Sequence, residues 1–282
     1  MKQVAIQGIP GAYHEIAARN YFGEEEVEIV PCLTFKEIFV QAKKNPALIG
    51  VMAIENTIAG GLLQNHDLLK MNNLEIAGEY KLRISHSLAA LSGQETADIT
   101  EIMSHPMALM QCADFLDTLP DVKLVEHEDT ALAAKEISEK QLRGRAAICS
   151  DLAAKMYNLD ILASGIETNK RNFTRFLVLA NEKMLSEVRK HQEVNKSSLV
   201  FVLPHKEGSL SQVLSVLSFY GVNLTRIQSL PIIGREWEYQ FYIDLTFSDY
   251  NRYKKSVEAI LPLVAKLKVL GEYVEDKQLM NE

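Results

Sequence analysis

Apolar residues along this chain form short continuous runs and longer amphipathic stretches, and the two kinds alternate. The continuous runs have the length of strands buried on both faces and lie at 4–6, 48–54 and 176–180. An amphipathic stretch of helix length follows at 34–44, and Thr34 with Glu37 predicts a capping box at its start. Buried strands that alternate with helices are typical of an α/β fold, which we predict for this part of the chain.

The alternation begins again after a long extended segment, 76–91, which bends around Ser85-His86-Ser87. The elements predicted beyond it are strands at 122–125 and 145–149 and helices at 131–140 and 151–157. The chain then returns through Asn172 to the strand at 176–180. We therefore predict two α/β lobes joined by two crossings, with a cleft between the lobes that suits a small ligand.

The last third of the chain has a different order of elements. A polar, charged stretch indicates a linker or a solvated helix, and the pattern beyond it predicts strand, helix, strand, strand, helix, strand. That βαββαβ order is typical of a ferredoxin-like domain. The predicted organisation is a two-lobed region at 1–180, with lobes at about 1–78 plus 172–180 and about 79–171, a linker at 181–196, and the ferredoxin-like domain at 197–276.

Composition narrows the class of protein. The chain has 282 residues, of which 47% are hydrophobic and 24% charged, as in an ordinary soluble globular protein. A net charge of −7 argues against a nucleic-acid surface, and no apolar run reaches membrane-spanning length. The N-terminus leads directly into a strand, without a signal peptide, and the three scattered cysteines form no CxxC motif. We expect a protein of the reducing cytoplasm.

A glycine turn, Gly8-Ile9-Pro10-Gly11-Ala12-Tyr13, connects the first strand to a helix. Such a turn brings backbone N–H groups and a helix N-terminus to an anion. A dinucleotide site would need GxGxxG and an acidic residue after the second strand, and neither is present. The alternatives that remain are an anion site of another kind and a tight turn without a ligand.

Polar side chains gather where two buried strands begin or end. Glu55, Asn56 and Thr57 follow one strand, and polar ligand groups at the carboxyl ends of parallel strands are usual in open α/β sheets. Thr174 and Arg175 precede another strand: a hydroxyl that can donate to a leaving group and a guanidinium that suits a carboxylate. We expect these two groups of side chains to serve an anionic ligand, although a strand that merely begins with polar residues is the simpler alternative.

A further motif combines a helix start with potential nucleophiles. Ser104 or His105 caps a helix that carries Gln111 and Cys112. A Cys–His nucleophile pair is disfavoured because the two residues are seven apart, about two helical turns, and a buried structural cysteine is the better interpretation. The histidines show no metal-binding spacing, so no metal is expected.

Together these motifs resemble the prephenate dehydratase family. Four motifs carry the resemblance, in the family's order: Gly8-Ile9-Pro10-Gly11-Ala12-Tyr13, Ile54-Glu55-Asn56-Thr57, Ser104-His105-Pro106 with Gln111-Cys112, and Asn172-Phe173-Thr174-Arg175-Phe176. The resemblance implies two lobes of the periplasmic-binding-protein type. It also implies catalytic residues at Asn56, Ser104, Gln111, Thr174 and Arg175, and substrate-binding residues at Gly11, Ala12, Tyr13, Thr57 and Phe176. The sequence departs from the family pattern at Ala53 (usually Pro), Met107 (usually Gln) and His14 (usually Ser).

The reaction implied by the family needs no cofactor. Prephenate loses CO2 and its ring hydroxyl to give phenylpyruvate, and formation of the aromatic ring drives the step. The protein must hold and desolvate a dianion and donate a proton or hydrogen bond to the departing oxygen. Arg175 and the helix N-termini after Gly11 and at Ser104 suit the carboxylates, and Thr174 suits the hydroxyl.

The C-terminal domain resembles an ACT domain, the amino-acid-sensing module of the same family. The matching residues imply an allosteric site for L-phenylalanine at Gly208, Ser209, Leu210, Asn223 and Leu224, and pairing of chains into a homodimer or homotetramer. Gln228-Ser229-Leu230-Pro231 stands where the family has Glu-Ser-Arg-Pro. A domain that serves only dimerisation is one alternative. For the whole protein, the alternatives are a non-catalytic amino-acid sensor and a dehydratase that also accepts arogenate.

Overall fold

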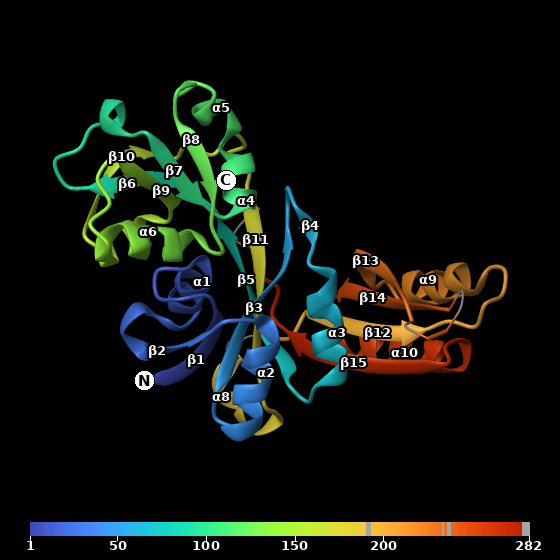
Figure 1. Cartoon of the computed structure of the whole chain (residues 1–282). Coiled ribbons are helices and arrows are strands. Elements are labelled where there is room, and N and C mark those ends of the chain that lie inside the picture. The colour runs from blue at the N-terminus through green and yellow to red at the C-terminus, as the bar shows by residue number, and fades with distance from the viewer. Residues whose placement is uncertain (190–192, 233, 236–237, 278–282) are drawn as a thin grey trace. The chain divides into compact units, whose positions relative to one another are not determined.

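The computed structural model describes residues 1–189, 193–232, 234–235 and 238–277 (Figure 1). The chain forms two compact units. Unit 1 comprises Met1–Leu62 and Tyr80–Phe176, and unit 2 comprises Leu63–Glu79 and Leu177–Glu282. The α/β class with two periplasmic-binding-type lobes is confirmed, and most residues of both lobes lie in unit 1. Among the described residues, no helix is both long and apolar enough to cross a membrane.

The first lobe is built on a sheet with the strand order β2-β1-β3-β11-β5, in which β1 pairs in parallel with β2 and β3. Its elements are β1 (Lys2–Gln7), α1 (Tyr13–Phe22), η1 (Glu24–Glu26), β2 (Val27–Cys32), α2 (Phe35–Lys44), β3 (Ile49–Asn56), β4 (Gly60–Gly61), β5 (Glu75–Arg83) and β11 (Phe173–Ala180). The chain passes between the units within β5 and β11. Thr34 caps α2 as predicted, but the Glu37 carboxylate accepts from the Leu33 N–H, one residue before the position that a capping box requires.

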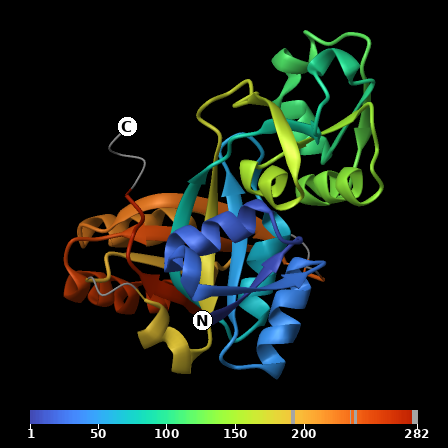
Figure 2. The same ribbon diagram turned by 90° about the vertical axis from the view of Figure 1, so that its left-hand side faces the viewer.

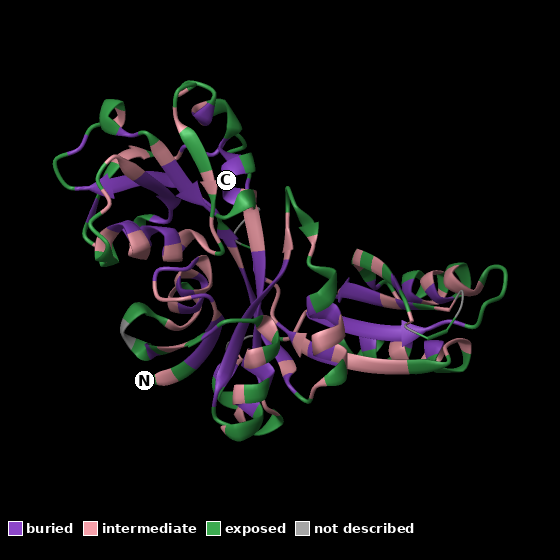
Figure 3. Ribbon diagram, viewed as in Figure 1, coloured by how far each residue is buried: buried purple, intermediate pink, exposed green. Residues whose placement is uncertain are grey.

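The second lobe has a five-stranded sheet with the order β10-β6-β9-β7-β8. Its elements are β6 (Ser87–Leu91), η2 (Thr96–Asp98), β7 (Glu101–Ser104), α4 (Pro106–Gln111), α5 (Ala113–Leu116), β8 (Lys123–Glu126), α6 (Thr130–Glu139), β9 (Arg145–Cys149), α7 (Asp151–Met156) and β10 (Leu159–Ser164). The sequence reading missed β10, an edge strand antiparallel to β6 whose residues are mostly exposed or half-buried and show no clean apolar alternation. The interior strands of this sheet are buried (Figure 3).

Two crossings join the lobes and run side by side (Figure 2). The Ile84 N–H donates to the Asn172 carbonyl at 2.7 Å, and the Ile166 N–H donates to the His86 carbonyl at 2.9 Å. The predicted bend around Ser85-His86-Ser87 is therefore the outgoing crossing, and the segment before β11 is the returning one.

Unit 2 contains an antiparallel sheet with the order β13-β14-β12-β15. Its elements are α3 (Leu63–Met71), η3 (Glu182–Met184), α8 (Leu185–Val188), β12 (Lys196–Val202), α9 (Ser209–Phe219), β13 (Asn223–Pro231), β14 (Tyr239–Thr246), α10 (Tyr250–Ile260), η4 (Leu261–Leu263) and β15 (Lys266–Tyr273). The order from β12 to β15 confirms the predicted βαββαβ arrangement. Residues 190–192 of the predicted linker lie outside the described residues.

The two faces of this sheet have different partners. Alternate residues Leu199, Phe201, Ile243 and Leu245 pack in one cluster with residues of α9 and α10. On β14, Gln240 and Tyr242 alternate with that set and instead bond to Asp67 on α3. Helix α3, which lies far from this domain in the sequence, therefore covers the face opposite the two domain helices.

Candidate functional site

The candidate site begins where β3 ends. The Asn56 Oδ1 atom accepts hydrogen bonds from the backbone N–H groups of Ile58 and Ala59, at 2.9 and 2.8 Å. The Asn56 Nδ2 atom donates to Asn172 Oδ1 at 2.8 Å and to Thr174 Oγ1 at 2.9 Å. The Asn56 carboxamide thus joins the end of β3 to the beginning of β11. Its two partners, Asn172 and Thr174, lie 116 and 118 residues further along the chain.

The same network continues into the second lobe. Asn172 Nδ2 donates to Gln111 Oε1 at 2.8 Å, and His86 Nε2 lies 3.0 Å from that same oxygen. His86 Nδ1 lies 2.8 Å from the Tyr13 hydroxyl, which donates to the Ser85 carbonyl at 2.8 Å. The site thus connects residues from β3, β11, α4, α1 and the outgoing crossing.

The direction of each hydrogen bond follows from the Asn56 end. Backbone N–H groups can only donate, so the Asn56 atom that they contact is the oxygen, and both Nδ2 hydrogens are then used. Thr174 Oγ1 is consequently an acceptor toward Asn56, and its hydroxyl hydrogen has no acceptor among the residues that the structure describes. Gln111 is oriented in the same way: its oxygen accepts from Asn172, and its Nε2 has no partner within the described part of the chain. A hydroxyl and an amide are thus available to an oxygen-bearing ligand.

Two arginines of this region are paired with carboxylates. Arg175 is 6% exposed, and its guanidinium donates to Glu55 Oε1 at 3.0 Å. On the returning crossing, the buried Glu167 carboxylate accepts from Arg83 at 3.1 Å and from the His86 backbone N–H at 2.9 Å. Neither cation stands without a carboxylate, so an anionic ligand at Arg175 would share the guanidinium with Glu55.

The glycine turn is closely packed. Gly11 has φ +94°, and a Cβ there would lie 2.9 Å from Ala153 Cα in α7, so only glycine fits. Its N–H donates to Glu15 at 2.7 Å, and its carbonyl accepts from Ser150 at 2.8 Å. The Ala12 N–H is bonded to the Ile9 carbonyl. The N–H groups of Gly11 and Ala12 are therefore engaged within the protein, and Tyr13 is the member of this turn that reaches the network.

Three other candidate residues lie outside the hydrogen-bonded network. Ser104 is fully buried in β7 and donates to the Ile148 carbonyl at 2.6 Å, while His105, not Ser104, caps α4. Thr57 is bonded through its hydroxyl and its N–H to the backbone of residues 171 and 173. Phe176 is buried, and its ring meets the edge of His14 at a centroid distance of 4.9 Å.

Two departures from the family pattern contact each other. The Ala53 N–H lies 3.4 Å from His14 Nε2, a contact that proline at position 53 would lack. Burial lowers the pKa of His14 to about 3, so the ring is neutral and Nε2 can accept. The third departure, Met107, donates its N–H to the His105 side chain.

The local contacts of Cys112 and His105 are those of structural residues, not of a Cys–His nucleophile pair. Burial raises the pKa of Cys112 to about 12, which keeps it a thiol, and His105 Nδ1 accepts from the Met107 N–H. No group of three or more metal-ligating side chains occurs among the residues described.

Sequence reasoning missed His86 and Glu167, both of them buried members of this region. The only signal for His86 was its place at the bend of an otherwise apolar extended segment. Asn172 belongs to one of the four motifs, but its contacts with both Asn56 and Gln111 require the fold.

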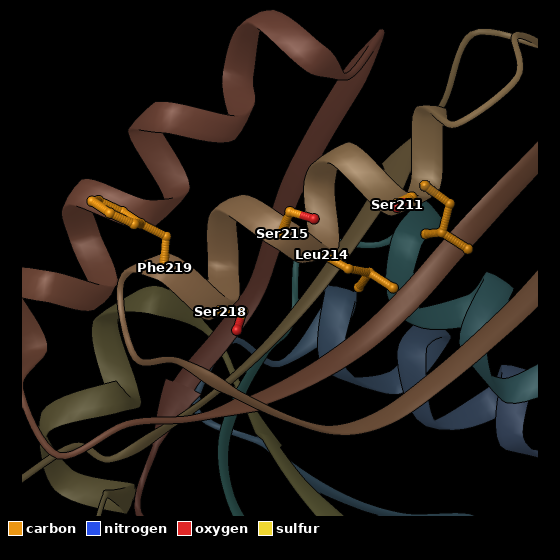
Figure 4. A pocket seen from close by; sticks show the side chains of 6 residues that line it. Ser211, Leu214, Ser215, Ser218 and Phe219 are labelled. Carbon is orange, nitrogen blue, oxygen red and sulfur yellow. The ribbon is translucent and has the colours of Figure 1, made fainter.

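The candidate allosteric residues lie in unit 2, around the start of α9 and the start of β13. Gly208 has φ +75° and precedes α9, and the Ser209 hydroxyl bonds to the carbonyls of Pro204 and Lys206. Asn223 contacts Thr246 at 3.4 Å, and Leu210 and Leu224 pack on the helix side of the sheet. A hollow along α9 is lined by Leu210, Ser211, Leu214, Ser215, Ser218 and Phe219 (Figure 4).

A two-lobed α/β unit with polar side chains at its crossings is the architecture of a small-molecule enzyme or binding protein. Similarity to known proteins shows the family. The profile of the family described as prephenate dehydratase matches residues 4–184, and this chain belongs to that family.

The chain is 35% identical over 288 residues to "Arogenate dehydratase/prephenate dehydratase 2, chloroplastic" of Arabidopsis thaliana, covering 99% of this chain and 74% of the relative. Among solved structures, a prephenate dehydratase in complex with L-Phe from Arthrobacter aurescens superimposes with a TM-score of 0.85 at 26% identity, covering 97% of this chain and 90% of that one. A structure titled as GqqA, a novel type of quorum quenching acylase, superimposes with a TM-score of 0.86 at 28% identity, covering 98% of both chains.

Proposed function

We propose that this protein converts prephenate to phenylpyruvate, CO2 and water, as a lyase of phenylalanine biosynthesis. The observation that carries the proposal is the orientation of the Asn56 carboxamide. Because Asn56 donates to Thr174 Oγ1, the Thr174 O–H is available to the ring hydroxyl that leaves.

The other side chains fit the remaining demands of this reaction. The amide of Gln111 supplies N–H donors, and Arg175 offers a fork to a carboxylate while Glu55 holds the guanidinium in place. The carboxylate lost as CO2 leaves its electron pair in the ring, the ring hydroxyl departs as hydroxide, and one proton completes water. Release of CO2 and formation of the aromatic ring drive the step, so the protein's task is orientation and desolvation.

Arogenate is the second candidate substrate, because the relative cited above carries both names. Arogenate has an ammonium-bearing carbon where prephenate has a keto group, so a carboxylate near the amine would favour it. The direct test is ultraviolet absorbance of phenylpyruvate formed from prephenate, beside amino-acid analysis of phenylalanine formed from arogenate. If the protein converts neither prephenate nor arogenate, the proposal is refuted. An N-acylated quorum signal incubated in parallel tests for the quorum quenching acylase activity that GqqA is named for.

We further propose that L-phenylalanine binds the βαββαβ domain and inhibits the enzyme, as the L-Phe complex of the Arthrobacter relative suggests. The domain would then act as an ACT domain at about 197–276. Phe219 is 79% exposed beside the hollow along α9, and this apolar surface supports pairing with a second copy into a homodimer or homotetramer (Figure 4). We also expect the protein to work in a reducing compartment, because its three cysteines are buried and free.

Gly208→Val tests the regulatory proposal. A β-branched side chain is strained at φ +75°, so the turn before α9 should shift. Isothermal titration and activity assays on the parent should show phenylalanine binding with inhibition, and the variant should lose both while keeping its basal turnover. If the parent shows no binding heat and no inhibition at millimolar phenylalanine, the regulatory proposal is refuted. The catalytic proposal would be unaffected by that result.

A further inference from the structure

We propose that His86 is a positioning residue of this active site, and that its Nε2–H fixes the orientation of the Gln111 carboxamide. The inference rests on the proposed function for its activity readout. His86 belongs to none of the four motifs by which the family is recognised in this sequence, and it lies on the outgoing crossing between β5 and β6.

His86 is held on several sides. Only 2% of the residue is exposed, its backbone N–H donates to the buried Glu167, and its ring meets the Tyr13 ring edge-on at 5.5 Å. Both ring nitrogens have partners, Gln111 Oε1 at 3.0 Å and the Tyr13 hydroxyl at 2.8 Å. A ring fixed at two ends can hold a neighbouring amide in one orientation.

The proton of His86 can be assigned from its neighbours. Burial lowers the pKa of His86, against smaller opposite effects of Gln111 and Glu167, so the ring is neutral at neutral pH and carries one proton. Gln111 Oε1 accepts from Asn172, so it presents an acceptor to the ring, and the proton lies on Nε2. Nδ1 is then an acceptor, and it shares the single Tyr13 hydroxyl hydrogen with the Ser85 carbonyl, which accepts from the same hydroxyl at 2.8 Å.

This arrangement determines which end of Gln111 serves the substrate. Two donors, from Asn172 and His86, hold Oε1 and leave the –NH2 group to a ligand. A rotation of the amide by 180° would place its N–H groups against both donors. Without the His86 donor, the oxygen keeps only the Asn172 bond, and the amide gains freedom to turn away from the reacting molecule.

Replacing His86 with glutamine or with asparagine distinguishes the roles of its two ring nitrogens. In His86→Gln, the side-chain –NH2 can occupy the place of Nε2 and still donate to Gln111. In His86→Asn, the shorter amide reaches only the place of Nδ1, on the Tyr13 side. We expect His86→Gln to keep kcat/KM for prephenate within about threefold and His86→Asn to lose about 10²-fold, mostly in kcat, as for other misplaced active-site groups. Thermal unfolding of both variants controls for a loss of fold.

A double-mutant cycle with Gln111→Ala tests whether the effect of His86 on activity passes through Gln111. If His86 acts through Gln111, then His86→Asn should cost little more in the Gln111→Ala background. Equal losses in His86→Gln and His86→Asn, or additive losses in the cycle, would overturn the proposal.

The tautomer gives a readout that needs no activity. Long-range 1H–15N correlation spectra of the parent should show the Nε2–H form of His86 at neutral pH, identified by its absence from the His86→Gln spectrum. A neutral ring with the proton on Nδ1 would overturn the proposal. If the parent converts neither prephenate nor arogenate, the proposed function fails, and this spectrum still decides the orientation of Gln111.

Discussion

Two partly buried polar networks in this chain use similar side chains for different purposes. At the crossings of unit 1, Thr174 and Gln111 have donors without acceptors among the described residues. Beneath α3 in unit 2, donors meet acceptors: Asp67 accepts from Gln240 at 2.8 Å and from Tyr242 at 3.1 Å. Lys268 donates to the carbonyls of Leu69, Lys70 and Asn72 around the end of α3. Polar groups whose hydrogen bonds are all made within the protein stabilise a fold. Polar groups with an unused hydrogen-bond donor indicate a place for a ligand.

Because the Thr174 hydroxyl hydrogen is left for a ligand, we expect Thr174→Ala to reduce the rate of the reaction and to change the stability of the fold very little. Turnover of prephenate should fall by about 10²–10⁴-fold, the range for loss of a positioned proton donor. Thr174→Ser, which keeps the hydroxyl that Asn56 orients, is the matched control and should retain most activity. Turnover within a few-fold of the parent in Thr174→Ala would show that the network is structural at this point, as it is under α3.

Arg175→Lys is expected to have the next largest effect. The charge remains but the fork is lost, so KM for prephenate should rise by about tenfold or more, and the contact with Glu55 should loosen. Steady-state kinetics of this variant beside Glu55→Gln would show whether the guanidinium needs its partner. Parent-like KM and kcat in Arg175→Lys would move the carboxylate-binding role to another residue.

Lys268→Met tests the opposite expectation for unit 2. Burial lowers the pKa of Lys268, but its ammonium still satisfies three carbonyls around the C-terminal end of α3. Loss of these bonds should reduce the free energy of unfolding by about 1–3 kcal/mol. Prephenate turnover per folded molecule should stay near that of the parent, measured with urea titration beside the assay. A large loss of turnover at unchanged stability would contradict the distinction drawn between the two networks.

His14 is expected to give the smallest effect, on the pH dependence of stability. Its pKa falls from 6.5 to about 3 on burial, so the unfolded chain binds a proton more readily than the folded protein. This contribution to stability is complete above pH 6.5 and is lost as the pH falls toward 3, by up to about 1.4 kcal/mol per pH unit. His14→Gln can still accept from the Ala53 N–H but does not titrate, so its stability should fall less steeply between pH 6 and pH 4. Parallel pH profiles of the two proteins would show that the folded protein does not depress the pKa of His14.

Much of this protein follows from local sequence. The apolar runs of β1, β3 and β11 and the βαββαβ order depend on burial and period, which the chain carries residue by residue. The four motifs likewise single out Asn56, Gln111 and Thr174 from the amino-acid sequence alone. The edge strand β10 escaped because an exposed edge need not alternate apolar and polar residues.

Other features depend on contacts between distant segments, and only the tertiary structure decides them. Residues 116 and 118 positions apart must meet before Asn56 can orient Thr174, and His86 must be buried before its proton is fixed. The side of the sheet that α3 covers likewise has no local signature. The same is true of the need for glycine at 271, where a Cβ would clash with the Ile76 carbonyl oxygen. Burial and period are properties of single segments and can be predicted from sequence, whereas the direction of a hydrogen bond belongs to pairs of atoms that only the complete fold brings together.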